Sequence, residues 1–241
     1  MSWVIDREEW LELYSWIKKE LPGLNFERDQ YSAEVLSALL EEHEGTIELE
    51  GLLEAISGYE VAVVVGCSEA LERDAEYLKQ ALGSNKKVLV AAANGATAVL
   101  LSRGIIPGLV TTDLDGDLAA ISRSAGLGSV VVVHAHGDNV DRLPGVRAVK
   151  GRIVGSTQAE PRPHVYNFGG FTDGDRAAFI LYHAGYRKIH LLGFDFEKPS
   201  QCPGKARLNP EVKKRKLEVA RRLVEFLQSR GVEVVHGLVD W

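Results

Sequence analysis

Three acidic side chains lie close together in the segment LVTTDLDGD, residues 109–117, where a run of apolar and β-branched residues ends. Asp113 and Asp115 are two residues apart, so in an extended chain both carboxylates project to the same side. Adjacent carboxylates repel unless a cation lies between them, and Mg²⁺ is usually held by one or two carboxylates together with substrate phosphates. The segment therefore predicts a metal site made of Asp113, Asp115 and Asp117. The alternative is a solvated turn in which Asp117 caps the following helix.

A second polar segment, HAHGDN at residues 134–139, also follows an apolar run. It is similar to the HxHxDH of dinuclear metallohydrolases, but Asn139 stands where the final His is required, so a zinc hydrolase is not expected. His134, His136 and Asp138 are predicted to contact the substrate, with the two imidazoles reaching a phosphate or a neighbouring carboxylate. A hydrogen-bonded structural pair of histidines is the alternative.

The third segment, NFGGFTDGDRAAFILYHAG at residues 167–185, places polar residues at the start of an amphipathic pattern. Thr172 and Asp175 have the spacing of a capping box. A helix N-terminus favours anions, and Arg176 adds a fixed positive charge there. We therefore expect Asp173, Asp175 and Arg176 to take part in catalysis, while capping alone is the other explanation of the two acids.

Two further turns and a basic stretch are predicted to bind a nucleotide. The segment VVVGCSEAL joins an apolar run to a helix, and Asn-Gly follows the next run, but neither GxGxxG nor a P-loop is present. The run KKRK at residues 213–216 and the cations before it suit a triphosphate, or else form a solvated helix face. The predicted ATP contacts are Gly66, Ser68, Asn94, Gly95, Lys205, Arg207 and Lys213.

These segments are positioned by an alternation of apolar runs and helical patterns. The runs at residues 61–65, 88–92, 109–112, 130–133, 189–193 and 232–235 are apolar on both faces, as in parallel strands that helices cover on both sides. Ligands of such sheets bind beyond the carboxyl ends of the strands. Residues 58–241 are therefore predicted to form a Rossmann-like α/β domain with a mostly parallel sheet. Residues 1–57, which are rich in Leu and Glu, are predicted to form a small helical N-terminal region.

Composition limits the functional classes. The chain has 241 residues, 45% hydrophobic and 26% charged, which excludes a disordered chain, and its net charge of -6 disfavours nucleic acid as a partner. No apolar run approaches the ~20 residues that span a bilayer, and no export signal is visible, so a cytoplasmic protein without membrane contact is expected. Cys67 and Cys202 lack metal-ligand spacing, which argues against a zinc knuckle and against a disulfide framework.

Taken together, TDLDGD, HAHGDN, GFTDGDRA and LLGFDF, in this order, resemble the archaeal 6-hydroxymethyl-7,8-dihydropterin diphosphokinase family over about residues 60–230. The resemblance implies a Rossmann-like domain related in style to thiamine pyrophosphokinases. It implies transfer of a diphosphoryl group from ATP to the pterin hydroxymethyl oxygen, with release of AMP and with Mg²⁺ as cofactor. Such a step belongs to tetrahydromethanopterin or folate-type pterin biosynthesis.

The resemblance assigns roles by position. Asp113 and Asp115 match the acidic metal-binding motif of the family, and Gly66 and Ser68 match its nucleotide-binding turn, where relatives commonly read GxGPSL and this chain reads GCSEAL. The flat pterin needs a carboxylate or amide at its edge and an apolar surface against its ring. The predicted contacts are Phe171 and Asp195, with Phe168 and Phe194 as further choices, although all three Phe also suit a core.

Other functions stay open on the sequence alone. Similar chains occur among motility accessory proteins, which implies a nucleotide-sugar-dependent glycosyltransferase as the alternative. DLDGD also looks like the start of a haloacid-dehalogenase-type phosphatase, but Asp117 occupies the position of the usual Thr or Val. A non-catalytic nucleotide- or pterin-binding module is the third alternative. The apolar stripes of the N-terminal helices suit packing within one chain or between copies in a homo-oligomer.

Overall fold

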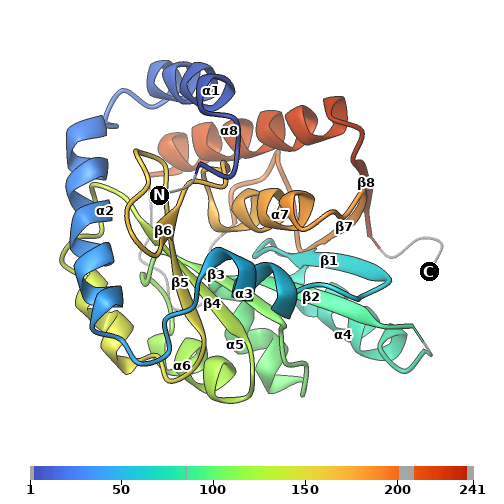
Figure 1. The fold of residues 1–241 in the computed structure, drawn as a ribbon. Helices are drawn as coiled ribbons and strands as arrows, with labels where there is room; N and C mark the ends of the chain where they lie inside the picture. Colours follow the sequence, from blue (N-terminus) through green and yellow to red (C-terminus); the bar gives the residue numbers. More distant parts are fainter. Residues whose placement is uncertain (1–2, 85, 201–208, 238–241) are drawn as a thin grey trace.

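A computed structural model describes residues 3–84, 86–200 and 209–237 of the chain (Figure 1). Its centre is an eight-stranded sheet in the order β6-β5-β4-β3-β2-β1-β7-β8, in which every paired strand runs parallel. The strands are β1 (Val61–Val65), β2 (Val88–Ala93), β3 (Leu109–Thr112), β4 (Val130–Ala135), β5 (Ile153–Thr157), β6 (Val165–Tyr166), β7 (Lys188–Leu192) and β8 (Glu233–His236).

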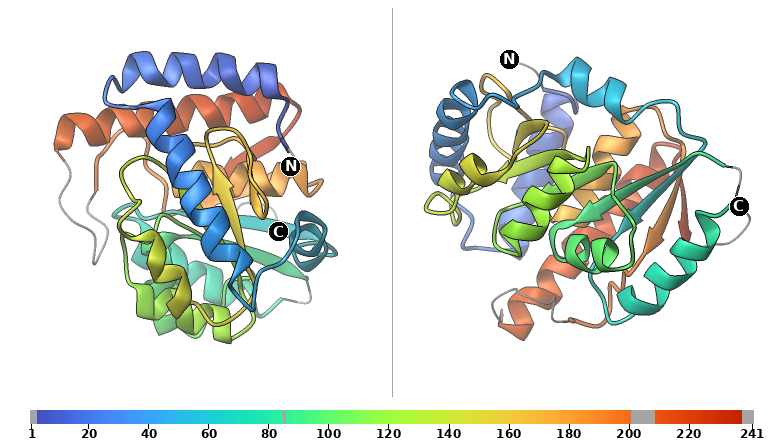
Figure 2. Two further views of the ribbon diagram at one scale, coloured as in Figure 1. Left: turned by 60° about the vertical axis from the view of Figure 1, so that its left-hand side comes forward. Right: turned by 90° about the horizontal axis from the view of Figure 1, so that it is seen from below.

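Helices cover both faces of this sheet (Figure 2). Successive strand residues face opposite sides, so Val64 packs in one core cluster and its neighbours Val63 and Val65 pack in the other. Both faces are apolar because both are covered, which confirms the predicted α/β class. The helices are α1 (Arg7–Glu20), α2 (Phe26–Glu41), α3 (Leu49–Ala55), α4 (Leu71–Ala81), α5 (Asn94–Ser102), α6 (Leu118–Gly126), the 3₁₀ helix η1 (Leu143–Ala148), α7 (Asp173–His183) and α8 (Pro210–Ser229).

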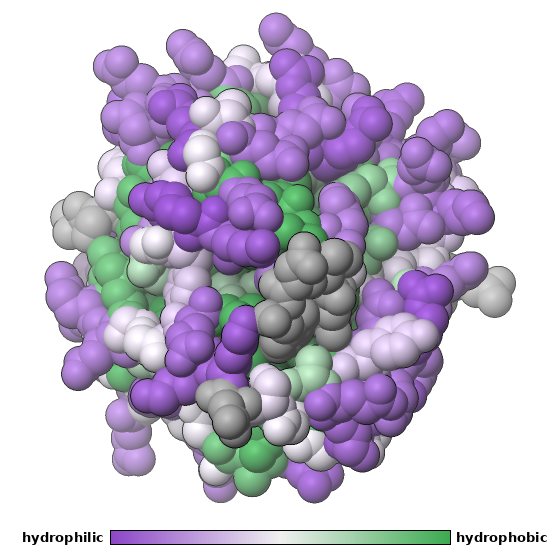
Figure 3. Space-filling model, turned by 90° about the vertical axis from the view of Figure 1, so that its right-hand side faces the viewer, coloured by the Kyte–Doolittle hydropathy of each residue, from purple (hydrophilic) through white to green (hydrophobic). Residues whose placement is uncertain are grey.

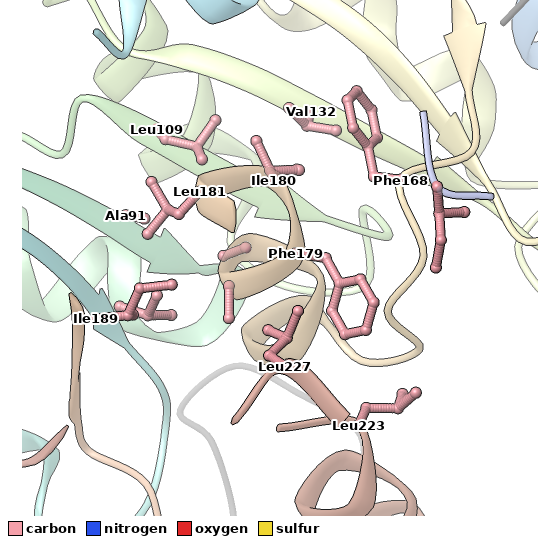
Figure 4. Close-up of a cluster of buried hydrophobic side chains, with 14 of the residues drawn as sticks. Ala91, Leu109, Val132, Phe168, Phe179, Ile180, Leu181, Ile189, Leu223 and Leu227 are labelled. Atoms are coloured by element: carbon pink, nitrogen blue, oxygen red, sulfur yellow. The ribbon is translucent and has the colours of Figure 1, made fainter. Parts of the chain in front are cut away.

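The core on the α7 face joins distant parts of the chain (Figure 4). Phe179 and Ile180 of α7 belong to the same buried cluster as Leu109 of β3, and Leu227 of α8 packs there too. Trp10 of α1 is a fully buried member of this cluster. The N-terminal helices therefore share a core with the sheet. The division between residues 57 and 58 stays a prediction.

The strand order reverses at β1, which has β2 on one side and β7 on the other. Connections from β1 onwards build the sheet in one direction as far as β6, and the chain then returns through α7 to β7. The carboxyl ends of all the strands lie at one edge because the strands are parallel. A crevice at such a reversal is the usual ligand position in open α/β sheets.

Within residues 3–84, 86–200 and 209–237, every helix is too short or too polar to span a bilayer. The face shown in Figure 3 is mostly hydrophilic, with small apolar areas between the polar side chains. Cys67 is disulfide-bonded, and with two cysteines in the chain this is one bond and not a disulfide framework. Cys202 lies outside the described residues.

Candidate functional site

The acidic loop after β3 meets Asn94, the first residue of α5, at the carboxyl edge of the sheet. The Asn94 amide nitrogen Nδ2 donates to Oδ1 of Asp113 at 3.2 Å and to Oδ1 of Asp115 at 2.6 Å. Asn94 is 2% exposed, whereas both carboxylates are half-buried. The structure thus places together two predicted metal ligands and one predicted ATP contact. A shared donor between two carboxylates partly offsets their mutual repulsion.

Local bonds fix the shape of this loop. Leu114 has a left-handed backbone with φ of 60°, and its N–H donates to Oγ1 of Thr112 at 2.9 Å. Gly116 lies against Asn94, and a Cβ at residue 116 would be only 2.4 Å from Asn94 Oδ1. The backbone therefore approaches the amide more closely than any side chain permits. Asp113 and Asp115 are held at the strand end by this close contact.

The two histidines after β4 lie at different depths. Their rings stack with centroids 5.6 Å apart, and His136 Nε2 is 3.7 Å from Oδ2 of Asp113. His134 is 3% exposed, and its Nε2 lies 3.0 Å from Nη2 of Arg176. A guanidinium can only donate, so His134 Nε2 accepts and its Nδ1–H donates to Ser156 Oγ at 3.2 Å. His136 therefore faces the acid pair, and His134 supports it from beneath.

Burial decides the charge of the groups under the site. Burial, together with the neighbouring Arg176, holds the pKa of His134 well below its ordinary value, so the imidazole is neutral. Burial lowers the pKa of Arg176 to about 10, which leaves the guanidinium charged at neutral pH. Arg176 is fully buried, and it donates to the carbonyl oxygens of Gly169 at 3.1 Å and Phe171 at 3.4 Å. It therefore lies beneath the site, bonded within the protein.

The two acids at the start of α7 have different surroundings. Asp175 is buried and closes a capping box, accepting hydrogen bonds from the backbone N–H groups of Phe171 and Thr172 and from the Thr172 hydroxyl. Burial raises its pKa. Capping, the alternative explanation, thus accounts for the hydrogen bonds of Asp175, and its part in catalysis stays a prediction. Asp173 is half-buried, and its carbonyl accepts from Thr111 Oγ1 at 2.8 Å, which ties the start of α7 to β3.

Three other predicted acids lie apart from the pair. Asp117 is exposed and caps α6 by accepting from the N–H of Ala120 at 3.0 Å, which is the alternative to the predicted metal contact. Asp138 is exposed and pairs with Arg28 at 3.3 Å. Asp195 accepts from two backbone N–H groups of its own turn, which lower its pKa. Phe171 is partly buried against the α7 core.

The turns after β1 and β7 touch at the strand reversal. Ser68 N–H donates to the carbonyl of Gly193 at 2.8 Å, and a Cβ at Gly66 would lie 2.8 Å from that same oxygen. Gly193 is held in turn by Asp74 of α4, whose Oδ2 accepts from the Gly193 N–H at 2.9 Å. The two glycines therefore let the backbones of these turns approach each other closely. Nucleotide binding at this turn stays a prediction.

The remaining predicted nucleotide contacts are spread over other elements. Gly95 is buried in the first turn of α5, beside Asn94. Lys213 lies near the start of α8 and is half-buried. Lys205 and Arg207 fall outside the described residues. The structure therefore brings together Gly66, Ser68 and the Asn94–Gly95 pair at the carboxyl edge.

Sequence reasoning missed several residues that organise the site. Asn139 donates to the carbonyl of Asp113 at 3.0 Å and to that of His134 at 2.7 Å, so it joins the two polar loops. Asn139 ends the HAHGDN segment, where the sequence shows only that it replaces the final histidine of the metallohydrolase motif. Ser156 lies on β5, a strand whose Gly, Ser and Thr content hides it from a search for apolar runs.

The donor set suits a hard cation. Among the described residues, no three His, Cys, Asp or Glu side chains are arranged to hold a metal by themselves. Asp113 and Asp115 nevertheless supply adjacent carboxylate oxygens within reach of one amide group. Two carboxylates with the remaining positions filled by phosphate and water match the usual mode of Mg²⁺ binding.

Comparison with known proteins points to one family. The family model described as "6-hydroxymethylpterin diphosphokinase MptE-like" matches residues 37–200, more than half of the chain. A relative from Pyrococcus furiosus is 43% identical over 239 residues, covering 96% of each chain. One from Methanocaldococcus jannaschii is 34% identical over 238 residues, covering 94% of this chain and 97% of the relative. Both are named 6-hydroxymethyl-7,8-dihydropterin pyrophosphokinase.

A solved structure shares the fold at greater distance. The motility accessory factor glycosyltransferase of Magnetospirillum magneticum AMB-1 superposes with a TM-score of 0.50 at 15% sequence identity. The match covers 90% of this chain and 38% of that protein. At this identity the likeness concerns the fold alone.

Proposed function

The chain belongs to the MptE-like family of 6-hydroxymethylpterin diphosphokinases, and from this premise we propose that it transfers the diphosphoryl group of ATP to the hydroxymethyl oxygen of 6-hydroxymethyl-7,8-dihydropterin, releasing AMP. It is an enzyme of the transferase class, as its nearly full-length relatives are named. The observation that carries the proposal is the pair of carboxylates, Asp113 and Asp115, joined by Asn94 at the carboxyl edge of the sheet.

Charge is the main obstacle to this reaction. ATP carries about four negative charges at neutral pH, and the acceptor oxygen must approach the β-phosphorus in line with the leaving group. Asp113 and Asp115 would hold Mg²⁺ with the phosphates, and the bound ion would neutralise charge and orient the chain of phosphates. His136, 3.7 Å from Asp113, lies where its ring can donate a hydrogen bond to a phosphate oxygen.

The substrates would lie on either side of the acid pair. The turn from Gly66 to Ser68 would offer backbone groups to the nucleotide, and its close packing against Gly193 holds it at the strand reversal. Asp195 and Phe171 remain our choices for the edge and the face of the pterin. The use of ATP agrees with the cytoplasmic location that the sequence predicts.

One incubation tests the reaction. The protein is mixed with ATP, Mg²⁺ and reduced 6-hydroxymethylpterin, and AMP, inorganic phosphate and pterin are followed by chromatography. We expect AMP to appear in step with the loss of the pterin. Inorganic phosphate without AMP would instead indicate a hydrolase, and consumption of a sugar nucleotide in its place would indicate a glycosyltransferase.

A further inference from the structure

The N-terminal helices reach the loop that carries His136. Asp29 in the first turn of α2 is 2% exposed, and its Oδ1 accepts a hydrogen bond from the backbone N–H of Gly137 at 2.7 Å. Ser32, one helical turn later, donates its hydroxyl to the carbonyl of His136 at 2.6 Å. Two polar side chains of α2 thus hold consecutive backbone groups of the loop after β4.

The second carboxylate oxygen of Asp29 accepts hydrogen bonds from two other parts of the chain. Oδ2 accepts from the hydroxyl of Tyr14 on α1 at 2.5 Å and from Nε2 of Gln158, just after β5, at 2.7 Å. Trp10, also on α1, donates its indole N–H to the carbonyl of Gln158 at 2.9 Å. Asp29 therefore joins α1, α2 and the carboxyl ends of β4 and β5 in one buried network.

The contact is close enough to restrict the residue at position 137. A Cβ on Gly137 would lie 2.7 Å from Cβ of Arg28 and 3.3 Å from Oδ1 of Asp29. Arg28 also donates to the Gly137 carbonyl at 2.9 Å. Both backbone polar groups of Gly137 are thus bonded to α2, which leaves the loop little freedom to move.

We infer that Asp29 is a positioning residue, which acts through the loop after β4 to hold His136 against the acid pair. A buried carboxylate is costly unless its oxygens are hydrogen-bonded. Three donors satisfy Asp29, and one of them is the backbone N–H of Gly137, the residue after His136. Displacement of a contacting group by about 1 Å can cost about a hundredfold in rate. The inference rests on the proposed function, because it assigns Asp29 a part in that same site.

Asp29→Asn tests the inference, since it keeps the shape but turns one acceptor into a donor that faces other donors. Glu34→Gln is the matched control on α2, where Glu34 makes a half-exposed ion pair with Arg162. Ser32→Ala is a milder variant that leaves Asp29 in place and removes only the bond to the His136 carbonyl. For each protein we would measure kcat and both KM values, the urea midpoint, and the imidazole resonances of His136 in ¹⁵N-histidine-labelled protein at fixed pH.

We expect Asp29→Asn to lower kcat at least about tenfold with KM for ATP changed less than about threefold, and to shift the His136 resonances. Ser32→Ala should lower kcat about threefold with a smaller shift, and Glu34→Gln should change neither. The inference would be overturned if the Asp29→Asn protein is folded, its His136 resonances are unshifted and its kcat equals that of the wild type. If Asp29→Asn does not fold, the same two readouts on Ser32→Ala decide. If the wild type forms no AMP, the proposed function is contradicted. The His136 resonances would still show whether Asp29 positions His136.

Discussion

Asp113 and Asp115 both accept a hydrogen bond from the side-chain amide of Asn94. Each carboxylate contributes its own negative charge at this position. We expect Asp113→Asn or Asp115→Asn to lower the turnover of AMP formation by roughly a hundredfold or more, because each removes a charge that we propose holds Mg²⁺ while keeping the side-chain shape. The urea midpoint of each variant, measured beside the rate, verifies that the fold persists. Wild-type Mg²⁺-dependent rates in both variants would contradict the metal assignment.

A substitution of Asp117 distinguishes helix capping from metal binding within the same loop. Because its carboxylate accepts from the N–H of Ala120 at the start of α6, Asp117→Asn should retain the cap and the stability of the protein. The variant should therefore keep its turnover to within about twofold. A loss of rate comparable with that of Asp113→Asn, measured in the same assay, would instead support the predicted metal contact of Asp117.

His134 makes the stability depend on pH. Its pKa is depressed by burial and by Arg176, so below the ordinary value of 6.5 the unfolded chain binds a proton that the folded chain refuses. The free energy of unfolding should therefore fall as the pH drops below 6.5, and it should continue to fall until the pH reaches the folded-state pKa. Urea unfolding at about pH 7.5 and about pH 5.5 should show a larger loss for the wild type than for His134→Gln. Equal losses would mean that other groups, such as the half-buried His183, whose pKa burial also lowers, account for the whole effect.

The start of α7 shows how an element depends on its first residues. The side chain of Thr172 accepts from the backbone N–H of Asp175, and the side chain of Asp175 accepts from the backbone N–H of Thr172. The carbonyl of Asp173 accepts a hydrogen bond from Thr111 of β3. Thr172→Ala should lower the free energy of unfolding by about 1–2 kcal/mol, as the loss of a cap does. Thr172→Ser, which keeps the hydroxyl, should stay within about 0.5 kcal/mol of the wild type in the same urea titration. No difference between the two variants would show that the box is not stabilising.

Gly116 tests the close packing of the acidic loop on α5. A methyl group at this position would lie 2.4 Å from Asn94 Oδ1, so Gly116→Ala must displace the amide that joins Asp113 and Asp115. We expect a loss of about 1–3 kcal/mol in stability and at least about a tenfold fall in turnover. Gly23→Ala is the control, because nothing lies within 4 Å of its added Cβ. Similar kinetics in the two variants would argue against a role of the Asn94 contact in catalysis.

Strands with continuous apolar runs were predictable from the sequence, and the two that lack them were not. The run VVVV predicted β4, and the structure confirms it with two more residues at its carboxyl end. The strand β5, IVGST, ends in three small or polar residues. One of them, Ser156, is hydrogen-bonded to His134 and so belongs to the candidate site. The strand β6 has two residues, too few for a periodic signal.

Residues of the candidate site could be predicted where they followed apolar runs, and Asp29 was missed because it lies in a helix. It shares the buried face of α2 with Ala33, Leu36 and Leu40, where the helical period calls for apolar side chains. An acid on such a stripe needs partners from elsewhere in the chain, here Tyr14, Gln158 and Gly137. Long-range partners of this kind leave no trace in local spacing.

Across the whole molecule, helices from residues 1–57 enter both cores of the sheet. Trp10, Tyr14 and Ile17 of α1 belong to the cluster on the α7 face, whereas Leu36 and Leu40 of α2 belong to the cluster on the opposite face. The N-terminal region thus packs on both sides of the sheet, and Asp29 fastens it to the candidate site. Its loss would expose apolar surface on the sheet, so we expect it to unfold together with the sheet.

Tryptophan positions make this expectation measurable. Trp3, Trp10 and Trp16 all precede residue 58, and Trp241 is the one tryptophan after it. In a Trp241→Phe variant, tryptophan fluorescence therefore reports on residues 1–57 alone, while far-ultraviolet circular dichroism reports on helices throughout the chain. We expect the two signals to give the same urea midpoint and the same slope, because one shared core unfolds cooperatively. A fluorescence transition at lower urea would show that residues 1–57 form a separate unit. Asp29→Asn, which weakens the buried link by turning one acceptor into a donor, should then increase the difference between the two midpoints.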